Sequence, residues 1–287
     1  MIYKNEKLSK YNWFNLGGPA RIFFKPNSEK DLEEFLKKNW KVEKNIYVLG
    51  AGSNTLFRDS GFDGVIIKLG KVFNYTNLLD GNKIEVGAAT LDAKVSEFAL
   101  ENSISGFEFL SCIPGSIGGA IKMNSGCYNQ DISKIFFSLR AINKKGERRI
   151  FSKDEIEFFY RGSNFEHEWI ILSVVLKGKP GNKEEIKKEN LRLKNKKKED
   201  QPVRVKTCGS TFKNPENKKA WELIKKSDCS NFTVGGASIS SKHNNFFLND
   251  GNATALDIEN LITKVKKEVL KKTGVSLELE IKIVGDK

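Results

Sequence analysis

Two glycine-rich segments of the sequence have residue types that could bind a phosphate or diphosphate. The first, Gly50-Ala51-Gly52-Ser53-Asn54, directly follows the apolar run Ile46–Leu49. Glycines let backbone N–H groups approach an anion closely, while Ser53 and Asn54 add a hydroxyl and an amide donor. An ordinary tight turn is the alternative. A Rossmann fingerprint does not fit, because it requires a third glycine where Thr55 stands.

The second segment, Pro114-Gly115-Ser116-Ile117-Gly118-Gly119-Ala120, places a proline and three glycines among apolar residues, and Asn124 follows closely. A solvated loop would be more polar, so this stretch is predicted to be buried and defined by its backbone. Glycine carries a high entropy cost on folding, so glycine in a buried stretch usually has a reason. We interpret the segment as a place where a ligand passes close to the chain.

The composition indicates a globular protein of more than one domain. The chain has 287 residues, where one domain typically has roughly 100–200, and 39% of them are hydrophobic and 30% charged. No apolar run approaches the ~20 residues of a membrane-spanning helix. The N-terminal residues also lack the apolar core of an export signal. We therefore expect a soluble, cytoplasmic protein, and a monomer.

The net charge of +13 would suit a nucleic-acid-binding protein. Lysine far outnumbers arginine, however, and is dispersed apart from runs such as Lys194–Lys198 and Lys264–Lys272. Dispersed lysine is typical of solvated helix faces, so we expect neither a nucleic acid nor a membrane as partner. The charge would still steer anionic small molecules to the protein.

The cysteines and histidines show no metal-binding pattern. No C-x-x-C pair occurs, and a zinc site would need ligand pairs closer in sequence. A disulfide framework is not expected without an export signal. Of the four cysteines, Cys112, Cys127 and Cys208 fall inside glycine-rich segments, and we interpret these three first as small packing residues and second as reactive thiols. The fourth cysteine is Cys229, and the two histidines are His167 and His243.

Periodicity and turn residues predict an α+β protein. The expected strands are Arg21–Lys25, Ile46–Leu49 (buried), Gly64–Leu69, Lys83–Gly87, Ile135–Asn143, Glu147–Phe151, Trp169–Leu176, Phe246–Leu248 and Leu277–Val284. The expected helices are Asp31–Asn39 capped by Ser28, one that begins at Thr90 or Asp92, and Ala255–Lys272 stopped by Gly274. Lys179–Gln201, rich in Lys and Glu, is predicted to be a helical connector.

Taken together, these segments resemble the UDP-N-acetylenolpyruvoylglucosamine reductases of peptidoglycan synthesis (the MurB family). The resemblance covers nearly the whole chain, with the motifs in the family's order. The motifs are Trp13–Ala20, Leu49–Asn54, Gly61–Ile66, Gly106–Ala120, Met123–Gly126, Tyr160–Ser163, Gly209–Pro215, Gly235–Ser240, His243–Phe246 and Glu278–Lys282. Small departures occur: Ser125 and Cys127 stand where the family commonly has alanine, and Cys208 where it commonly has glycine.

The resemblance implies an FAD-binding fold of the vanillyl-alcohol-oxidase/PCMH type in two α/β lobes, followed by a smaller C-terminal α+β substrate domain. On this sequence the lobes correspond to residues 1–70 and 71–180, the connector to 181–201 and the substrate-binding domain to 202–287. The short connector is similar to that of the subgroup without an extra tyrosine-bearing loop. The implied cofactor contacts are Gly50, Ala51, Gly52, Ser53, Asn54, Pro114, Gly115, Ser116, Gly118, Gly119 and Asn124.

The resemblance also implies the reaction. NADPH reduces FAD, and hydride then passes from flavin N5 to the enol ether of UDP-N-acetylglucosamine enolpyruvate, which gives UDP-N-acetylmuramate. Arg161 matches a position that binds the carboxylate, because a guanidinium holds oxyanions with fixed geometry. Ser210 matches the proton donor, beside Gly209. Glu280 matches the remaining active-site acid and could polarise the carboxylate if protonated.

Further residues match substrate-binding positions less specifically. Tyr160 stands beside Arg161, and Lys213 and Asn214 follow Ser210, although strand alternation lets only one of that pair share the face of Ser210. Lys282 stands where an arginine can occur in the family, and lysine lacks the planar fork of arginine. By the same alternation Glu278 and Glu280 share one face, opposite Leu277, Leu279 and Ile281. His243 is interpreted as a hydrogen-bonded structural residue rather than a base.

Two other functions remain as alternatives. An FAD-dependent oxidase of another small molecule would share the fold, but no histidine or cysteine is evident as a site of covalent flavin attachment. A basic nucleic-acid-binding protein would show clustered Arg and Lys with exposed aromatic residues. The motifs of this chain are glycine turns instead, so the sequence favours the reductase.

Overall fold

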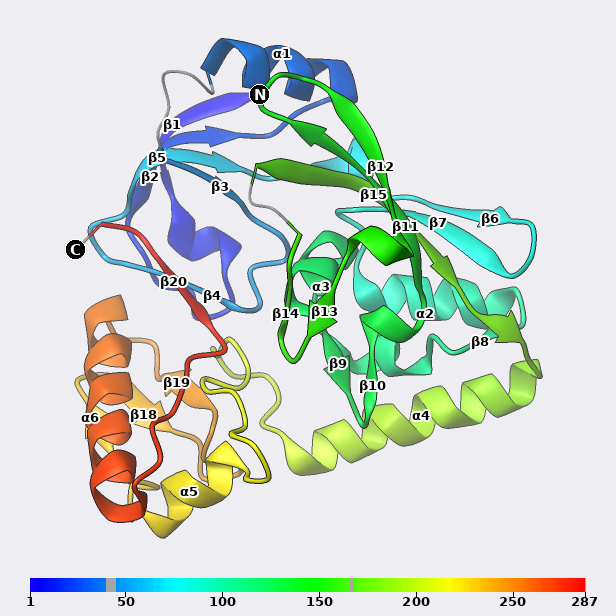
Figure 1. Ribbon diagram of the computed structural model, residues 1–287. Coiled ribbons are helices and arrows are strands. Elements are labelled where there is room, and N and C mark those ends of the chain that lie inside the picture. Colours follow the sequence, from blue (N-terminus) through cyan, green and yellow to red (C-terminus); the bar gives the residue numbers. More distant parts are fainter. Residues whose placement is uncertain (40–44, 166–167, 287) are drawn as a thin grey trace. The chain divides into compact units, whose positions relative to one another are not determined.

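The computed structural model describes residues 1–39, 45–165 and 168–286. The chain divides into two compact units, each built from separate stretches of sequence. The first comprises residues 1–3, 23–51 and 64–197, and the second residues 4–22, 52–63 and 198–287. Helices and strands mix in both units, as predicted for an α+β protein (Figure 1).

This division differs from the boundaries expected from the sequence. Residues 4–22 and 52–63 cluster with the C-terminal stretch, and residues 181–197 of the connector cluster with the first unit. The physical reason is a long-range pairing. Strand β4 (Thr55–Phe57) pairs in parallel with β20 (Lys282–Val284), from the opposite end of the chain. Local patterns carry no information about such a pair.

The first unit contains a five-stranded antiparallel sheet with the strand order β12-β11-β15-β7-β6. Its strands are β6 (Thr76–Leu79), β7 (Lys83–Gly87), β11 (Phe136–Asn143), β12 (Arg148–Ser152) and β15 (Trp169–Lys177). All but β6 were predicted to within one or two residues. The side chains of β6 lie at a sheet edge and are mostly exposed, so no apolar alternation marks this strand.

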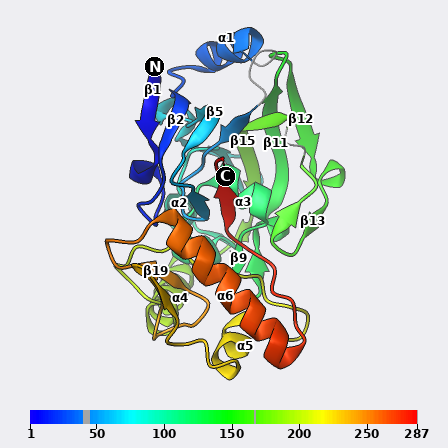
Figure 2. The same ribbon diagram turned by 90° about the vertical axis from the view of Figure 1, so that its left-hand side faces the viewer.

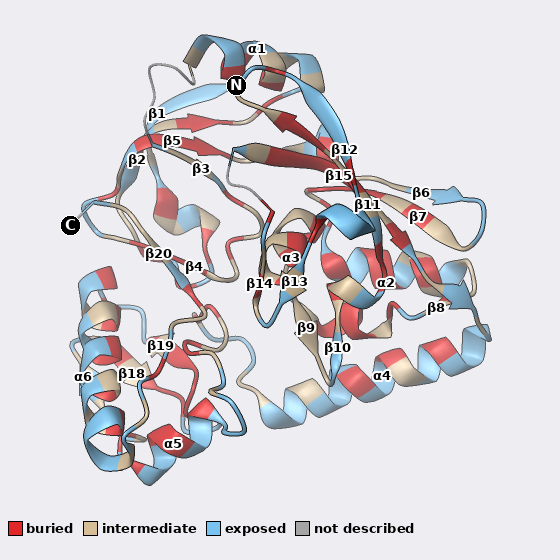
Figure 3. Ribbon diagram, in the orientation of Figure 1, coloured by how far each residue is buried: buried red, intermediate tan, exposed pale blue. Residues whose placement is uncertain are grey.

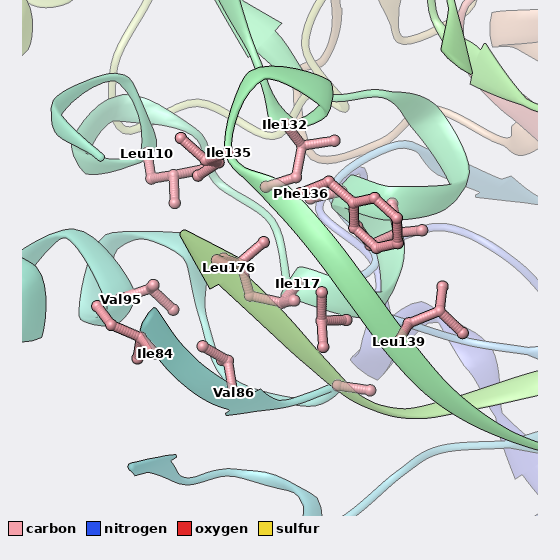
Figure 4. Close-up of a cluster of buried hydrophobic side chains, with 14 of the residues drawn as sticks. Ile84, Val86, Val95, Leu110, Ile117, Ile132, Ile135, Phe136, Leu139 and Leu176 are labelled. Carbon is pink, nitrogen blue, oxygen red and sulfur yellow. The ribbon is translucent and has the colours of Figure 1, made fainter. Parts of the chain in front are cut away.

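Helices α2 (Asp92–Glu101) and α3 (Ile117–Met123) pack with the 3₁₀ turn η3 (Glu108–Cys112) on this sheet. Figure 4 shows the buried core, in which Val95 of α2 and Ile117 of α3 lie against side chains of β7, β11 and β15. This core fixes the position of α3 and therefore of the second glycine-rich segment, which α3 contains.

A second sheet has the order β1-β2-β5-β3. Its strands are β1 (Ile2–Lys7), β2 (Pro19–Phe24), β3 (Ile46–Val48) and β5 (Phe62–Ile67), with β3 and β5 parallel. The strand expected at Ile46–Leu49 is present as β3, but the expectation that it is buried was wrong, because β3 is an edge strand and Val48 is exposed. Helix α1 (Glu29–Asn39) begins as predicted, with the Ser28 hydroxyl accepting a hydrogen bond from the Asp31 N–H at 3.0 Å.

Helix α4 (Lys183–Asp200) is the predicted connector helix. Its residues 183–197 belong to the first unit, where Ile186, Asn190 and Leu193 form a buried stripe (Figure 3). Asn190 accepts a hydrogen bond from the Ser96 hydroxyl of α2 at 3.2 Å. The smaller elements of the first unit are η2 (Lys71–Phe73), β8 (Ile104–Ser105), β9 (Gly126–Cys127), β10 (Gln130–Asp131), η4 (Ile132–Lys134), η5 (Lys153–Glu155), β13 (Phe158–Phe159), β14 (Gly162–Ser163) and β16 (Lys179–Pro180).

The second unit contains an antiparallel sheet of order β17-β18-β19, packed with the neighbouring helices α5 and α6 (Figure 2). Helix α6 begins at a capping box made by Thr254 and Asp257 and ends at Gly274, whose φ is 68°. The predicted helix and its stop are therefore confirmed. The elements of this unit also include η1 (Leu8–Tyr11), α5 (Ala220–Lys226), β17 (Thr233–Val234), β18 (Ala237–Ile239), β19 (Phe247–Asn249) and α6 (Ala255–Thr273).

The last predicted strand, Leu277–Val284, is regular only over Lys282–Val284. Its first half makes an isolated bridge between Leu279 and Phe212 instead of a continuous ladder. The predicted alternation nevertheless holds, since Leu277 and Ile281 are buried and Glu278 is exposed. None of the helices within the described residues combines the length and apolar character needed to cross a membrane.

Candidate functional site

The second glycine-rich segment forms the start of helix α3. Ser116 is the N-cap residue, and its main-chain carbonyl accepts a hydrogen bond from the Ala120 N–H at 2.8 Å. The N–H groups of Ile117 and Gly118 donate to the carbonyls of Thr90 and Ala88, at 3.0 and 2.9 Å. The sequence did not predict α3, because Gly118 and Gly119 are poor helix formers. Tertiary hydrogen bonds hold this turn in place.

The Ser116 hydroxyl lies between the two glycine-rich segments within the first unit. A Cβ atom on Gly50 would stand only 2.8 Å from Ser116 Oγ, and one on Gly119 would stand 3.7 Å from it. The hydroxyl is buried and has no hydrogen-bond partner among the described residues. A buried donor without a partner is costly. A ligand oxygen at this place would complete its hydrogen bonding, which fits the anion cradle predicted from Gly50 and Ser116.

Asp92, the first residue of α2, lies directly behind Gly115. A Cβ atom on Gly115 would stand 2.4 Å from Asp92 Oδ2. The Asp92 side chain is fully buried, and neither of its oxygens has a partner among the described residues. Burial raises the pKa of this carboxyl well above its usual range. Sequence reasoning treated Asp92 only as a helix start, so its position beneath the turn is new.

Lys68 is a second residue that sequence reasoning missed. It follows β5 and its ammonium group donates a hydrogen bond to the Gly50 carbonyl oxygen. Burial, with a smaller contribution from the charge of Lys25, lowers the pKa of Lys68 to about 8. A lysine that ends the apolar run Val65–Ile67 was the available signal. Lys68 brings a cation to the first glycine turn.

The boundary between the units falls inside the first turn, after Ala51. In the second unit Gly52 has a φ of 73°, and a Cβ atom there would stand 2.0 Å from the Tyr11 carbonyl oxygen. The Gly52 carbonyl accepts a hydrogen bond from the Trp13 N–H at 3.1 Å. Ser53 and Asn54 follow, and the Asn54 side-chain amide donates to the Glu280 carbonyl at 3.0 Å. This half of the turn is therefore fixed by its own unit.

Asn124, predicted as a cofactor contact, ends α3 in the left-handed conformation with a φ of 41°. Its side-chain amide donates to the Phe159 carbonyl at 3.1 Å, and its side-chain oxygen accepts from the Ser133 N–H at 3.3 Å. The first bond connects the end of α3 to β13 of the hairpin β13–β14, and the second connects it to η4. The contacts that Asn124 makes are those of a positioning residue.

Arg161 lies in the two-residue turn of this hairpin, between the paired residues Phe159 and Gly162. Its φ is 57°, a left-handed conformation that is unfavourable for a residue with a side chain. The guanidinium carbon stands 5.1 Å from the centre of the Tyr160 ring, which is half exposed. Strain of this kind persists at functional turns when the surroundings hold it. Arg161 and Tyr160 thus lie together in one turn, and the carboxylate-binding role expected for Arg161 stays a prediction.

Ser210 and Glu280 meet on neighbouring segments of the second unit. The Glu280 N–H donates to the Thr211 carbonyl at 2.9 Å, and Ser210 forms a bridge with Phe246. No heavy atom of the described residues lies within 4 Å of a Cβ atom placed on Gly209, so the chain next to Ser210 faces open space. The segments that carry Ser210 and Glu280 are therefore hydrogen-bonded neighbours through Thr211.

Asn245 holds the segment that contains Ser210. The sequence placed it in the motif His243–Phe246 but predicted no function for it. Its side-chain oxygen accepts a hydrogen bond from the Phe212 N–H at 2.9 Å, and its amide donates to the Phe212 carbonyl at 2.8 Å. The Thr211 N–H donates to the Asn245 carbonyl at 2.8 Å. These hydrogen bonds of Asn245 take the place of a regular β-ladder at Thr211 and Phe212. Asn245 therefore positions Ser210 through the residues that follow it.

The predicted substrate-binding residues of the second unit differ in their surroundings. Lys213 pairs with Glu278 at 3.6 Å, and the Asn214 side-chain oxygen accepts a hydrogen bond from the Ala220 N–H at 3.0 Å at the start of α5. Lys282 is exposed, and its N–H donates to the Asn54 carbonyl at 2.9 Å. Asn214 therefore caps a helix, while Lys213 and Lys282 have side chains that a ligand can reach.

His243 has the contacts of a packing residue. Its Nδ1 accepts a hydrogen bond from the Asn245 N–H at 3.3 Å, and its ring meets Phe246 edge to face at 4.8 Å. Burial lowers its pKa. His167 lies outside the described residues. Within the described ranges no group of three or more His, Cys, Asp or Glu side chains could hold a metal ion.

Comparison with known proteins defines the class first. Residues 20–152 match the family model described as an FAD binding domain. Residues 201–284 match the model described as the C-terminal domain of UDP-N-acetylenolpyruvoylglucosamine reductase. The chain therefore has an FAD-binding domain followed by the C-terminal domain of a reductase, which is the fold class predicted from the sequence.

Full-length relatives then identify the family. The chain is 50% identical to the UDP-N-acetylenolpyruvoylglucosamine reductase of Pelagibacter ubique, over 96% of this chain and 92% of that protein. It is 44% identical to the one from Orientia tsutsugamushi, over 99% and 94%. The crystal structure of the MurB protein from Thermus caldophilus superposes with a TM-score of 0.85 at 31% identity, covering 99% of this chain and 98% of that one. The chain belongs to the UDP-N-acetylenolpyruvoylglucosamine reductase family.

Proposed function

We propose that the protein reduces UDP-N-acetylglucosamine enolpyruvate to UDP-N-acetylmuramate, with NADPH as the source of electrons and FAD as the carrier, in peptidoglycan precursor synthesis. Membership of the reductase family supports this proposal, and so does the FAD binding domain over residues 20–152. The observation that carries it is the pairing of the Ser210 and Glu280 segments beside open space at Gly209. An oxidase of another small molecule has no need of that pair.

The residues of the two glycine turns fit a bound diphosphate. In the first unit these are Gly50, Ala51, Pro114, Gly115, Ser116, Gly118 and Gly119, and in the second Gly52, Ser53 and Asn54. The buried Ser116 hydroxyl, which has no partner among the described residues, would donate to a phosphate oxygen. Lys68 would balance part of the negative charge. When bound, FAD would supply the hydride.

Arg161 is proposed to bind the substrate carboxylate. The reaction moves negative charge toward that carboxylate as the adjacent double bond is reduced. A guanidinium stabilises such charge with two directed N–H groups and keeps its proton at all working pH values. The left-handed turn at Arg161 fixes the direction of the side chain before the substrate arrives, which reduces the cost of ordering it. Tyr160 would cover the same part of the substrate.

Ser210 is proposed to give its hydroxyl proton to the substrate carbon next to the new C–H bond. A serine is a weak acid, so close placement and stabilisation of the resulting charge are both required. The hydrogen bonds of Asn245 to Phe212 and Thr211 supply the placement, because they hold the chain that follows Ser210. Glu280 is proposed to polarise the substrate carboxylate, and Lys213 and Lys282 would meet the anionic remainder of the substrate. We further propose that the protein acts in the cytoplasm, as a monomer.

Ser210→Ala tests the proposal, because the reaction divides into two half-reactions. Stopped-flow absorbance of the flavin should show reduction by NADPH within about twofold of the wild-type rate. Reoxidation by the enol ether should slow by about 10²–10⁴-fold, the usual contribution of a positioned acid. Ser238→Ala, in β18 of the same unit, is the matched control. Equal damage to both half-reactions would count against Ser210 as the donor.

A further inference from the structure

Two thiol groups from different elements meet beside the second glycine turn. Cys112 ends η3, and Cys127 lies in β9, after α3. Their sulfur atoms are 3.3 Å apart. Both also lie close to the Phe109 carbonyl oxygen, at 3.2 Å from Cys112 and 3.4 Å from Cys127. Both cysteines carry free thiols. The expectation that they serve first as packing residues does not account for this contact.

The surroundings of Cys112 favour its thiolate. The hydrogen bond from Cys127 contributes most, and the charge of Lys197 contributes further, so that the pKa of Cys112 falls from 9.0 to about 7. Lys197 of α4 is half-buried, and its ammonium group donates to the Cys112 carbonyl oxygen. The positive charge of Arg161, in the hairpin turn, also favours the thiolate form of Cys127. By contrast, burial raises the pKa of Cys208 to about 12 and that of Cys229 to about 11.

We propose that Cys112 and Cys127 are a peroxide-oxidisable dithiol, which closes an intramolecular disulfide across the ends of the second glycine turn. The two sulfur atoms need to approach by only about 1.2 Å to reach the ~2.05 Å of a disulfide. The bond would close a loop that contains Pro114–Ala120 and all of α3. This inference rests on the contact between the sulfurs and not on the proposed reductase activity.

The oxidation balances with one hydrogen peroxide. The Cys112 thiolate attacks one peroxide oxygen, the O–O bond breaks, and Cys112 becomes a sulfenic acid while hydroxide leaves. The Cys127 sulfur then attacks the Cys112 sulfur and the S–O bond breaks. The departing hydroxide takes up the Cys127 proton, and the first hydroxide takes up the proton that Cys112 lost. Two thiols and one peroxide thus give one disulfide and two waters, and a dithiol reductant reverses the step.

The direct test measures the cross-link itself. The flavin-loaded protein is treated with one equivalent of hydrogen peroxide and then alkylated, and intact mass and a non-reducing peptide map are recorded. Before alkylation we expect a mass lower by two hydrogen atoms. After alkylation we expect two alkyl groups instead of four, and one cross-linked peptide pair that contains Cys112 and Cys127. Dithiothreitol should restore all four thiols. Disulfide-linked dimers, a cross-link at Cys208 or Cys229, or four unchanged thiols would overturn the proposal.

Matched variants assign the order of events. Cys127→Ser, which keeps a hydrogen-bond donor beside Cys112, should leave a Cys112 sulfenic acid that dimedone traps, whereas Cys112→Ala should trap none at Cys127. Cys229→Ala should form the cross-link as the wild type does. Dimedone labelling of Cys127 in the Cys112→Ala variant at the rate of Cys112 would contradict the assignment of Cys112 as the attacking thiol.

The electrostatic part of the proposal has its own readout. Alkylation of Cys112 by iodoacetamide should increase with pH through a midpoint of about 7. At neutral pH it should exceed that of Cys208 and Cys229 by about 10²-fold, after allowance for the lower nucleophilicity of a low-pKa thiolate. Lys197→Met should move the midpoint upward. An unchanged midpoint with lower thermal stability would assign Lys197 a structural role only, and labelling of Cys229 as fast as Cys112 would overturn the assignment.

Discussion

The glycines of the two glycine-rich turns are required for two different reasons. At Gly52, in the first turn, the missing Cβ would collide with a main-chain atom, the Tyr11 carbonyl oxygen, and the backbone is left-handed. At Gly50 and Gly115 the missing Cβ atoms face polar side chains, the Ser116 hydroxyl and the Asp92 carboxyl. Both of those side chains have buried oxygens without a partner in the described part of the chain.

This difference separates folding from binding within one motif. A glycine that faces its own backbone is required by the fold whether or not a ligand binds. A glycine that faces an unsatisfied buried hydroxyl leaves room at a place where a ligand oxygen has a reason to be. The presence of glycine at Gly52 is therefore weak evidence of cofactor contact, although the sequence motif predicted such a contact. The glycine at Gly50, which faces the Ser116 hydroxyl, is stronger evidence.

Gly52→Ala should have the largest effect. The new Cβ combines the strain of a left-handed residue with a 2.0 Å collision against main chain, which cannot move cheaply. We expect the free energy of unfolding to fall by about 2–4 kcal/mol, measured by urea denaturation with circular dichroism.

Gly81→Ala is the matched control for that substitution. Gly81 has a φ of 70°, close to the 73° of Gly52, but no described atom lies within 4 Å of its added Cβ. The free energy of unfolding should fall by about 1 kcal/mol in this variant, which is the cost of backbone strain alone. If the two losses were equal, the Tyr11 carbonyl would have no part in the requirement for glycine.

Gly115→Ala should have a smaller effect, because a side chain rather than main chain stands in the way. The added Cβ lies 2.4 Å from Asp92 Oδ2. A loss of about 1–3 kcal/mol is expected. In the double variant with Asp92→Ala the loss should shrink by at least about 0.5 kcal/mol, since contacting residues couple. Additive losses in this double-mutant cycle would show that the collision with Asp92 is not the cause.

Most of the fold was predictable wherever the pattern was local. The strand β7 and the helix α6, with its stop at Gly274, follow from side-chain alternation and capping residues. The position of α3 was not predictable, because Gly118 and Gly119 lower helix propensity and tertiary hydrogen bonds override it. The pairing of β4 with β20, which assigns residues 52–63 to the second unit, depends on contacts that no local window contains.

The candidate site was predictable in part for the same reason. Motif order predicted roles for Arg161, Ser210 and Glu280, and the structure brings the last two onto neighbouring segments. It could not identify Lys68 or Asp92, because their importance arises from burial beside a turn that is distant in sequence. Nor could it show that Asn124 uses its side chain to hold the Arg161 hairpin. Sequence gives the chemistry of a residue, while its partners require the fold.

The pH dependence of stability should depend on Asp92. Its folded-state pKa is raised by burial above its usual 3.8, so the folded protein retains this proton after the unfolded chain has lost it. Its contribution to stability is complete below about pH 4 and is lost as pH rises toward the folded-state value. Asp92→Asn should therefore gain stability relative to the wild type as pH rises, by at most ~1.4 kcal/mol per pH unit.

Denaturation midpoints between pH 4 and pH 8 would measure this difference. Asp154→Asn changes an exposed aspartate in η5 and provides the control for the loss of one carboxyl group. A constant difference for Asp92→Asn would mean that Asp92 is ionised in the folded protein. The second turn would then contain a buried negative charge, which would be hard to reconcile with a diphosphate beside it.

The smallest expected effect is at Lys68, and it tests whether the Gly50 half of the first turn contacts the ligand. If the diphosphate of FAD lies at Gly50, its charge should raise the pKa of Lys68 from about 8, and binding at pH 8 should take up about half a proton. Titration calorimetry in two buffers of different ionisation enthalpy measures that uptake. Lys68→Met should abolish it and weaken FAD binding by about 3–10-fold, as expected for one partly solvated charged hydrogen bond.

Lys71→Met removes a neighbouring lysine of η2 and controls for the loss of one positive charge. It should keep the proton uptake, because its effect on FAD would act only through the general field. A binding heat that does not depend on the buffer in the wild type would show that Lys68 does not sense the diphosphate. In that case the hydrogen bond from Lys68 to Gly50 would serve the turn itself, and both halves of the first turn would be requirements of the fold, leaving Ser116 of the second turn as the better indicator of the ligand.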